Sequence, residues 1–272
     1  MKEYNTIQRE RECFFEIHNI TAGYGKKEMI HNINFSLNSH TLTCLIGANG
    51  SGKTTLLKSI ANQLSHQGTC SIEGESLEQK SVKELARDVS YIPQKTGISI
   101  SMSVLDVVLM GYNARLKLLE NPSKKQIQQA CEVLSKIGLE KEIDTDYLNL
   151  SEGQKQLVIL ARMMIENTKI LLLDEPDSAL DVPNRFRMMS NIRHMVDTEE
   201  KAGILCLHDP MLALEFCDQL VLLKAGKCIG ILYPKKDSIG VMEKAFCQVY
   251  GNVSLMECFD KEGKRHFSMI GI

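Results

Sequence analysis

A glycine-rich stretch near the N-terminus has the spacing of a phosphate-binding loop. Residues 47–54 read GANGSGKT and fit the pattern G-x-x-x-x-G-K-[ST]. Glycines in such a loop let backbone N–H groups come close to phosphate oxygens at the start of a helix. Lys53 is expected to contact the β- and γ-phosphates of a nucleotide, and the Thr54 hydroxyl is expected to ligate Mg²⁺. A chance glycine-rich turn is the alternative for this pattern taken alone.

Two carboxylates follow a short apolar segment in ILLLDEP, residues 170–176. Ligands of open α/β sheets bind beyond the carboxyl ends of the strands. Asp174 is therefore the expected Mg²⁺ ligand, and Glu175 is placed to polarise an attacking water. A solvated acidic strand end is the alternative for this segment by itself. Its occurrence together with the glycine loop favours the catalytic interpretation.

A second anion-binding helix start is predicted in LSEGQKQ, residues 150–156. Ser151 and Gln154 fit a capping box, so a helix is expected to begin there with free N–H groups beside Gly153. A helix that is only well capped would have the same spacing. Together with the glycine loop, this gives two helix starts on one small domain that could each bind an anion, which is more than a simple helix cap explains.

The elements that must position these motifs alternate between strand and helix. Short apolar segments in residues 14–46 predict a β-rich start, and the strand LTCLI leads through the glycine loop into a helix. Helical spacing follows between residues 94 and 149. It includes a capping box at Ser123, with Ile127, Cys131 and Leu134 on one face and Gly138 as a stop. Three later apolar segments predict a parallel α/β core, namely ILLLD, GILCL and QLVLL.

Composition excludes several classes of protein. The 32 Lys and Arg and 34 Asp and Glu residues give a net charge of −2, which disfavours a general nucleic-acid binder. The longest apolar runs fall far short of the ~20 residues that cross a bilayer. The charged residues 1–12 do not resemble a secretory signal. Nine cysteines without a CxxC pair or zinc-like spacing predict reduced thiols, as in the cytosol.

Taken together, these motifs resemble the ATP-binding subunit of an ABC transporter over nearly the whole chain and in the family's order. Tyr24 resembles the aromatic residue that stacks on adenine. Gln94 in YIPQ resembles the glutamine that senses Mg²⁺ and the membrane subunit. Asp181 in SALD resembles part of the loop that crosses a dimer interface. His208 resembles the switch histidine at the γ-phosphate. Each of these four residues also has an ordinary structural explanation when it is considered alone.

The resemblance implies ATP and Mg²⁺ and assigns the site residues. Catalysis is expected from Lys53, Gln94, Glu175 and His208, and Mg²⁺ binding from Thr54, Gln94 and Asp174. The expected ATP contacts are Tyr24, Gly47, Asn49, Gly50, Ser51, Gly52, Lys53, Thr54, Thr55, Ser151, Gly153, Gln154 and Asp181.

The resemblance also implies a fold and a domain organisation. The expected class is α/β, a P-loop NTPase core with a mainly parallel sheet and an N-terminal antiparallel β subdomain. An α-helical subdomain at about residues 95–157 is expected to interrupt the core. The nucleotide-binding domain would span residues 1–232, and residues 233–272 would form a C-terminal extension with a helix and a hairpin turning near Gly263.

Partners follow from the same resemblance. Two copies would form a head-to-tail homodimer, in which the glycine loop of one copy and Ser151 and Gly153 of the other hold each ATP. Integral membrane permease subunits, and indirectly an extracytoplasmic substrate-binding protein, would be partners at the cytoplasmic face of the membrane. No nucleic-acid partner is expected.

Residues 207–227 and 248–259, with Tyr250 and Gly251, resemble the subgroup that imports iron chelates (siderophores), haem or cobalamin. A packing extension that says nothing about the cargo is the alternative for this tail. A soluble ABC-type ATPase acting on nucleic acid or ribosomes is the alternative function, although such proteins usually carry paired cassettes or long insertions. A P-loop kinase or GTPase would leave LSEGQ and His208 without a role.

Two residues depart from the family pattern. Glu152 stands where glycine is usual, and Asp177 stands where threonine is more common. Both add negative charge near a polyanion. Because the helix dipole favours a carboxylate at a helix start, Glu152 is expected to have little effect if it points outward.

Overall fold

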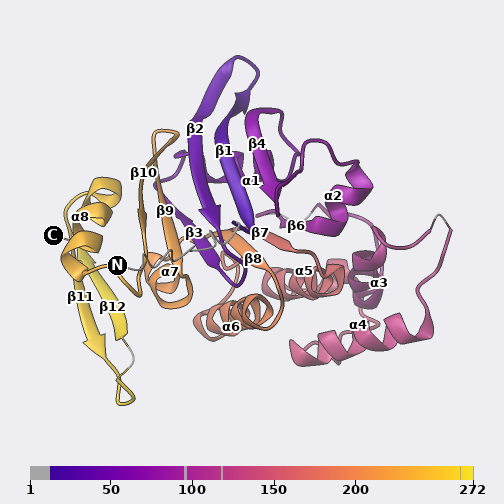
Figure 1. Cartoon of the computed structure of the whole chain (residues 1–272). Coiled ribbons are helices and arrows are strands. Elements are labelled where there is room, and N and C mark those ends of the chain that lie inside the picture. The colour runs from indigo at the N-terminus through magenta and orange to yellow at the C-terminus, as the bar shows by residue number, and fades with distance from the viewer. Residues whose placement is uncertain (1–12, 95–96, 118, 264, 272) are drawn as a thin grey trace, which may run out of the picture.

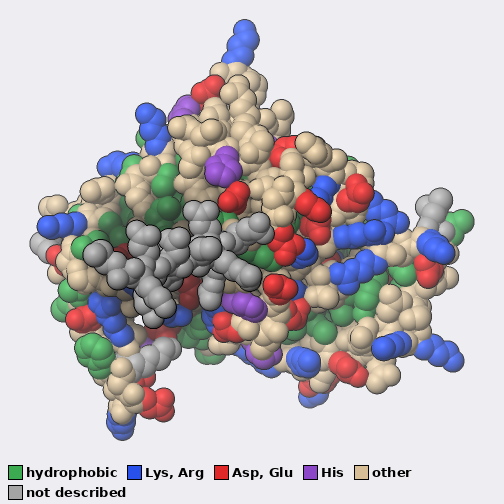
Figure 2. All heavy atoms as spheres, in the orientation of Figure 1, with side chains coloured by type: hydrophobic (Ala, Val, Ile, Leu, Met, Phe, Trp, Pro, Cys, Tyr) green, Lys and Arg blue, Asp and Glu red, His purple; other side chains and the backbone are tan. Residues whose placement is uncertain are grey.

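The computed structural model describes residues 13–94, 97–117, 119–263 and 265–271. The first twelve residues, on which the argument against a secretory signal rested, lie outside these ranges. No helix of the described ranges is both long and apolar enough to cross a membrane. Basic and acidic side chains are interspersed over the described part of the face in Figure 2, in line with the small net charge.

A six-stranded sheet forms the centre of the protein, in the order β10-β9-β3-β8-β7-β6. The five strands from β9 to β6 are parallel, and β10 joins antiparallel to β9. Their bounds are β3 (Leu42–Ile46), β6 (Val89–Ile92), β7 (Ile170–Asp174), β8 (Ala202–Cys206), β9 (Gln219–Lys224) and β10 (Lys227–Leu232).

Both faces of this sheet are buried, which explains the nearly continuous apolar strands. Ile170 and Leu172 of β7 face a core that includes α1 (Lys53–Ile60), whereas Leu171 and Leu173 belong to a second core with the larger helices. That second core is covered by α5 (Glu152–Glu166), α6 (Val182–Thr198) and α7 (Pro210–Phe216). Helix α1 therefore lies between two sheets.

The second sheet is antiparallel, with the order β2-β1-β4-β5. It contains β1 (Phe15–Tyr24), β2 (Lys27–Leu37), β4 (His66–Ile72) and β5 (Glu75–Ser76), and α2 (Val82–Asp88) follows. This is the predicted N-terminal β subdomain, seen at the top of Figure 1. Helix α1 ends at Ile60, and Leu64 packs against the same core from beyond its end.

The helical segment leaves the central sheet after β6 and extends to one side of it (Figure 1). It contains α3 (Val104–Leu109), α4 (Lys124–Lys136), the short 3₁₀ turns η1 (Met110–Tyr112) and η2 (Tyr147–Asn149), and α5. The Ser123 capping box forms as predicted. The predicted apolar face of α4 is partly wrong, because Ala130 and Leu134 are its buried residues and Ile127 is 37% exposed.

The C-terminal extension lies at the opposite side of the sheet from α4 (Figure 1). Helix α8 (Ile239–Tyr250) buries Met242 and Phe246 fully, and β11 (Val253–Phe259) pairs antiparallel with β12 (Arg265–Gly271). The hairpin turns at Gly263, as predicted, and β12 contacts α7. This extension therefore packs on the core as a continuation of it.

A candidate nucleotide site at the carboxyl edge of the sheet

Four neighbouring parallel strands bring the predicted chemistry to one edge of the sheet. The glycine loop follows β3, His208 follows β8, Glu175 follows β7 and Gln94 follows β6. Because β3, β8, β7 and β6 are consecutive neighbours, their carboxyl ends meet. Residues more than a hundred positions apart in the chain therefore line one cavity.

The glycine loop is a close-fitting cradle. A side chain at Gly47 would place its Cβ 2.5 Å from the Leu223 carbonyl oxygen, which no real side chain tolerates. Gly52 has φ 106, in the left-handed region that favours glycine. The Lys53 ammonium donates hydrogen bonds to the carbonyl oxygens of Gly47 at 2.7 Å and Ala48 at 3.3 Å. The loop thus wraps around the head of this lysine.

A pair of oxygen ligands lies beside the loop. The Thr54 hydroxyl donates a 3.1 Å hydrogen bond from Oγ1 to Oδ1 of Asp174. Asp174 is 1% exposed, and this burial, together with the nearby Glu175 charge, raises its pKa, while the Thr54 hydrogen bond acts in the opposite direction. Hydroxyl and carboxylate oxygens are the ligands that Mg²⁺ prefers. The two residues fit a magnesium ion.

The Glu175 carboxylate is held by two side chains from the neighbouring strand ends. His208 Nε2 donates a hydrogen bond of 2.7 Å to Oε2 of Glu175, and Gln94 Nε2 donates to the same oxygen. Glu175 is only 8% exposed and has φ 52, an uncommon backbone conformation for a glutamate. Such conformations concentrate at functional sites, where the surroundings hold them in place.

These groups line a cavity of about 310 Å³. Within it the Ser51 hydroxyl is buried and has no hydrogen-bond partner among the described residues, so a phosphate oxygen would supply one. Met29 of β2 also lines the cavity and was not predicted, because a single apolar residue in a strand gives no signal of ligand contact. The lining residues are Met29, Asn49, Gly50, Ser51, Gly52, Lys53, Thr54, Thr55, Gln94, Glu175 and His208.

Six predicted ATP contacts are not among the residues that line this cavity, namely Tyr24, Gly47, Ser151, Gly153, Gln154 and Asp181. Ser151 begins α5, and its Oγ accepts a hydrogen bond from the Gln154 backbone N–H at 3.3 Å. Gly153 lies against the chain before α6, where a Cβ would be 3.2 Å from the Ala179 carbonyl oxygen. Asp181 caps α6 through the Asn184 backbone N–H at 3.0 Å. The residues at these two helix starts form a second group on the same chain.

Tyr24 is also outside the cavity. It ends β1 and is 50% exposed, and it lines a separate hollow of about 510 Å³ together with His66. The ring is therefore accessible for stacking, but it does not contact the glycine loop residues that line the first cavity.

The two departures from the family pattern have opposite environments. The Glu152 side chain is 75% exposed and forms a 2.8 Å ion pair with Lys155. Asp177 is 1% exposed, and both of its carboxylate oxygens lack hydrogen-bond partners among the described residues. Burial raises the pKa of Asp177, an effect that the charges of Arg185 and His208 oppose.

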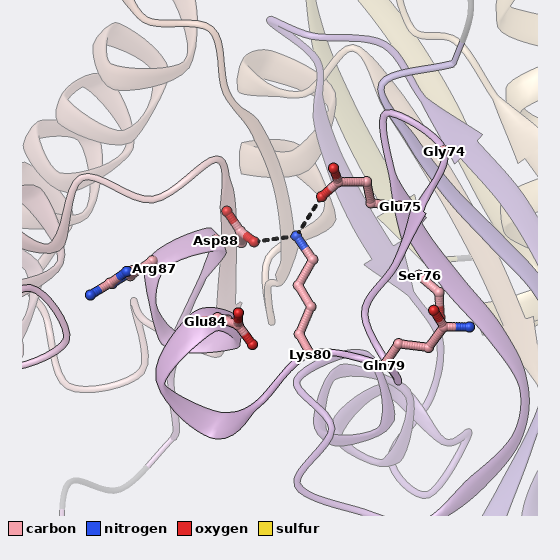
Figure 3. Close-up of a pocket in the computed structure, with 8 residues that line it drawn as sticks. All are labelled: Gly74, Glu75, Ser76, Gln79, Lys80, Glu84, Arg87 and Asp88. Atoms are coloured by element: carbon pink, nitrogen blue, oxygen red, sulfur yellow. Dashed lines mark hydrogen bonds and ion pairs between the residues drawn. The ribbon is translucent and has the colours of Figure 1, made fainter.

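A further hollow, shown in Figure 3, is lined by five charged residues, of which Glu75 and Asp88 pair with Lys80. Lys80 forms ion pairs with Glu75 at 3.0 Å and with Asp88 at 2.6 Å. Its ammonium is therefore already paired with two carboxylates.

Comparisons with known proteins agree with the geometry. The family described as ABC transporter matches residues 30–178. A probable iron chelatin transport ATP-binding protein of Helicobacter pylori is 36% identical over 214 residues, 78% of this chain and 84% of that protein. A hemin import ATP-binding protein of Vibrio anguillarum is 30% identical over 244 residues, covering 88% and 91%. A manganese transport ATP-binding protein of Bacillus subtilis is 32% identical over 215 residues, covering 78% and 84%.

Solved structures share the fold. A chain from an inward-facing transporter assigned to the metal-chelate type superposes with a TM-score of 0.79 at 22% identity, covering 95% of this chain and 98% of that one. The ADP conformation of an ATP-binding cassette gives 0.70 at 22% identity, covering 81% and 91%. The predicted α/β fold class is confirmed. By its sequence and its fold, the chain belongs to the ABC transporter family, as an ATP-binding cassette whose ATPase activity is coupled to transport.

Proposed function

We propose that this chain is the ATPase subunit of an importer and that the cavity at the glycine loop binds ATP with Mg²⁺. The observation that carries the proposal is the Glu175 carboxylate, fixed by Gln94 and His208 next to the oxygen pair of Thr54 and Asp174. The strand order brings Glu175, Thr54 and the glycine loop to one cavity, and Asp174 contacts Thr54 beside it, which supports the proposal. Hydrolysis by attack of water on a γ-phosphate requires groups of these kinds.

Each residue has a distinct role in this proposal. Glu175 orients the attacking water and accepts its proton, and His208 positions Glu175 and contacts the γ-phosphate. Lys53 leaves the loop carbonyls to contact the β- and γ-phosphates. Thr54, Asp174 and the Gln94 side chain would hold Mg²⁺, which would neutralise phosphate charge.

The second group of residues completes the site of a partner copy. Ser151, Gly153, Gln154 and Asp181 lie at two capped helix starts outside their own cavity. Free N–H groups at a helix start bind anions. In a head-to-tail homodimer, this surface of one copy would close over the ATP held by the other, with Tyr24 stacking on adenine. Binding of ATP favours the closed pair, and hydrolysis reopens it.

The proposed cargo is an iron chelate, haem or cobalamin, and it passes through separate integral membrane permease subunits. The similarity to iron chelatin and hemin transport proteins supports this choice, while similarity to a manganese transport protein defines the competing cargo class. The chain would lie peripherally at the cytoplasmic face of the membrane. An extracytoplasmic binding protein would deliver the cargo to the permease.

Dimerisation of Glu175→Gln measured by light scattering tests the shared site. ATP should convert this variant from monomer to dimer, and a further Ser151→Ala change should weaken the dimer at least tenfold. Ser123→Ala is the matched control, because Ser123 caps α4 with the same capping box but lies outside both groups. A monomer that hydrolyses ATP at the full rate and is indifferent to Ser151→Ala would refute the shared site.

Reconstitution tests the cargo. The chain and the permease with which it co-purifies would be placed in lipid vesicles with the matching binding protein. A ferric siderophore, haem or cobalamin should raise ATP turnover several-fold, whereas Mn²⁺ should not. Salt-sensitive binding of the purified chain to DNA or ribosomes would instead support the nucleic-acid alternative.

A further inference from the structure

A group of metal-ligating side chains lies in the N-terminal sheet, apart from the nucleotide cavity. His66 Nε2 or Nδ1, the Cys70 thiol and a Glu78 carboxylate oxygen all lie within 4.8 Å of one another. Among the residues that the structure describes, only this group brings three His, Cys, Asp or Glu ligand atoms so close. The assignment of ATP and Mg²⁺ to the glycine loop uses none of the three.

The hairpin between β4 and β5 creates this group. His66 and Cys70 lie four residues apart on β4, so the strand period of two places them on the same face. The chain then turns, pairs Glu75 with Ile72, and returns Glu78 to Cys70, whose carbonyl oxygen accepts a hydrogen bond of 2.8 Å from the Leu77 N–H. The spacing H-x₃-C-x₇-E becomes a cluster only through this strand pairing.

The Glu78 carboxylate is fixed before any ligand binds. Its Oε1 accepts a 2.7 Å hydrogen bond from the Cys70 backbone N–H, and its Oε2 accepts one of 2.7 Å from the Ser76 hydroxyl. These hydrogen bonds lower the pKa of Glu78 in spite of its partial burial, so the group is a carboxylate at neutral pH. A preorganised carboxylate loses little entropy when it binds a cation.

The two ring nitrogens of His66 each face an acceptor atom. Nδ1 lies 3.1 Å from the Leu64 carbonyl oxygen, which can only accept, so Nδ1 carries a hydrogen. In the neutral ring Nε2 is then an acceptor, yet it lies 3.2 Å from Oε1 of Glu78, which is also an acceptor. A metal ion between Nε2 and Oε1 would bind a lone pair of each atom.

We propose that His66 Nε2, Cys70 Sγ and Glu78 Oε1 bind a divalent cation of borderline softness, with Zn²⁺ the best match. Nitrogen, sulfur and oxygen donors together are the set that Zn²⁺ takes in proteins. Bonds of about 2.0–2.1 Å in a tetrahedron separate two light ligand atoms by about 3.3 Å, close to the 3.2 Å between Nε2 and Oε1. A water would fill the fourth position.

Charge and access suit this ion. The Cys70 side chain is buried and its pKa is raised, so the thiol is neutral until the cation binds; coordination then releases its proton to solvent as the thiolate–metal bond forms. The His66 side chain is 3% exposed and that of Glu78 is 27% exposed, so the ion would reach the site from the Glu78 side. The bound ion would tie β4 to the segment after β5.

Metal titration of the full chain, freed of metal by a chelator and without nucleotide, tests this site. Calorimetry with Zn²⁺ should give one tight site per chain, and His66→Gln and Cys70→Ala should each weaken it at least tenfold. Cys228→Ala is the matched control, because this half-buried thiol on β10 is a free cysteine of another sheet, and its loss should leave the affinity unchanged.

Co²⁺ provides a second measurement that does not depend on stability. The wild-type chain should show a thiolate-to-Co²⁺ charge-transfer absorption that disappears in Cys70→Ala and persists in Cys228→Ala. If no site of this kind forms, or if the affinity is the same in His66→Gln, the metal site is refuted. Because His66→Gln leaves the buried Cys70 untouched, a folding defect of Cys70→Ala cannot decide the result.

Discussion

His208 donates a 2.7 Å hydrogen bond to Glu175, although 33 positions separate the two residues in the chain. The contact exists because β7 and β8 are parallel neighbours, with Asp174 paired to Cys206 at their ends. The imidazole therefore holds the carboxylate from the side, in a cavity that the glycine loop closes. Replacement of either group should affect hydrolysis more than nucleotide binding.

Glu175→Gln should reduce ATP turnover at least 100-fold, because general-base catalysis contributes about 10²–10⁴-fold. The amide oxygen can still accept from His208, so the cavity should keep its shape and the ATP affinity should change less than threefold. Steady-state phosphate release and equilibrium binding of a fluorescent ATP analogue measure the two quantities. Turnover within fivefold of the wild type would show that Glu175 is not the base.

Glu152→Gly should change ATP turnover by less than tenfold, under about 1.4 kcal/mol of barrier. The side chain is 75% exposed, and its only described ion pair is with Lys155, so its removal leaves the Ser151 cap intact. A steady-state ATPase assay of the variant beside Ser151→Ala would check this. A larger effect of Glu152→Gly would mean that its charge acts on the nucleotide of the partner.

The sequence predicted the parts of this site that follow strand ends. Asp174, Glu175 and His208 each come directly after an apolar run, and parallel strands necessarily bring such positions together. Met29 could not be predicted, because its contact with the cavity depends on how β2 approaches the glycine loop. Ile127 was placed in a core because helical spacing defines a face but not which part of it another helix covers.

Side-chain environments off the strands were less predictable than the strands themselves. The sequence marked Asp177 as unusual, but neither its burial nor the left-handed backbone of Glu175 could be predicted from spacing. His66, Cys70 and Glu78 do not fit a zinc motif in sequence, because only the register of β4 with β5 brings them together. The environments of these side chains therefore depend on contacts between distant parts of the chain, which local sequence patterns do not reveal.

Gly47→Ala should destabilise the loop and weaken ATP binding at least tenfold, because its Cβ would overlap the Leu223 carbonyl oxygen and the Ser51 side chain. Overpacking of this kind costs about 1–3 kcal/mol. Gly50→Ala is the control: nothing lies within 4 Å of its Cβ, and only its left-handed φ of 78 opposes the change. Thermal unfolding and binding of an ATP analogue would compare the two variants. Equal effects would contradict the claim that close packing around Gly47 shapes the loop.

Asp177→Asn should stabilise the protein at pH 7.5 by about 1 kcal/mol, because a neutral amide of the same shape is less costly to bury than a carboxylate. Burial raises the pKa of Asp177 above its ordinary 3.8, so the folded state binds a proton more tightly than the unfolded state. Stability therefore falls as pH rises through the interval between these pKa values, and an amide avoids that loss.

Thermal unfolding at pH 7.5 and pH 3.5 would measure this gain. The midpoint of Asp177→Asn should exceed that of the wild type by about 2–4 °C at pH 7.5, and the difference should become much smaller at pH 3.5, where the carboxyl is mostly protonated in both states. Asp144→Asn, at an exposed position, is the control and should change neither value. A pH-independent gain would show that charge is not the cause.

The attachment of the C-terminal hairpin to α7 should weaken as pH rises. His266 of β12 lies 2.8 Å from a Glu215 carboxylate oxygen of α7 and 3.1 Å from one of Asp260 in the hairpin turn. Hydrogen bonds to Asp260 and then Glu215 raise the pKa of His266 above its ordinary 6.5. The stabilisation is therefore complete below about pH 6.5 and is lost as pH rises through the raised value.

Unfolding midpoints of the wild type and His266→Gln between pH 5.5 and pH 9 would test this dependence. The wild type should be the more stable protein at pH 6, and the difference should shrink toward pH 9, because neutral His266 gains no charge attraction from the two carboxylates. His18→Gln is the matched control, since this 57% exposed ring lies 3.4 Å from a single glutamate. A constant difference between wild type and His266→Gln at every pH would mean that the ring packs against α7 without depending on its charge.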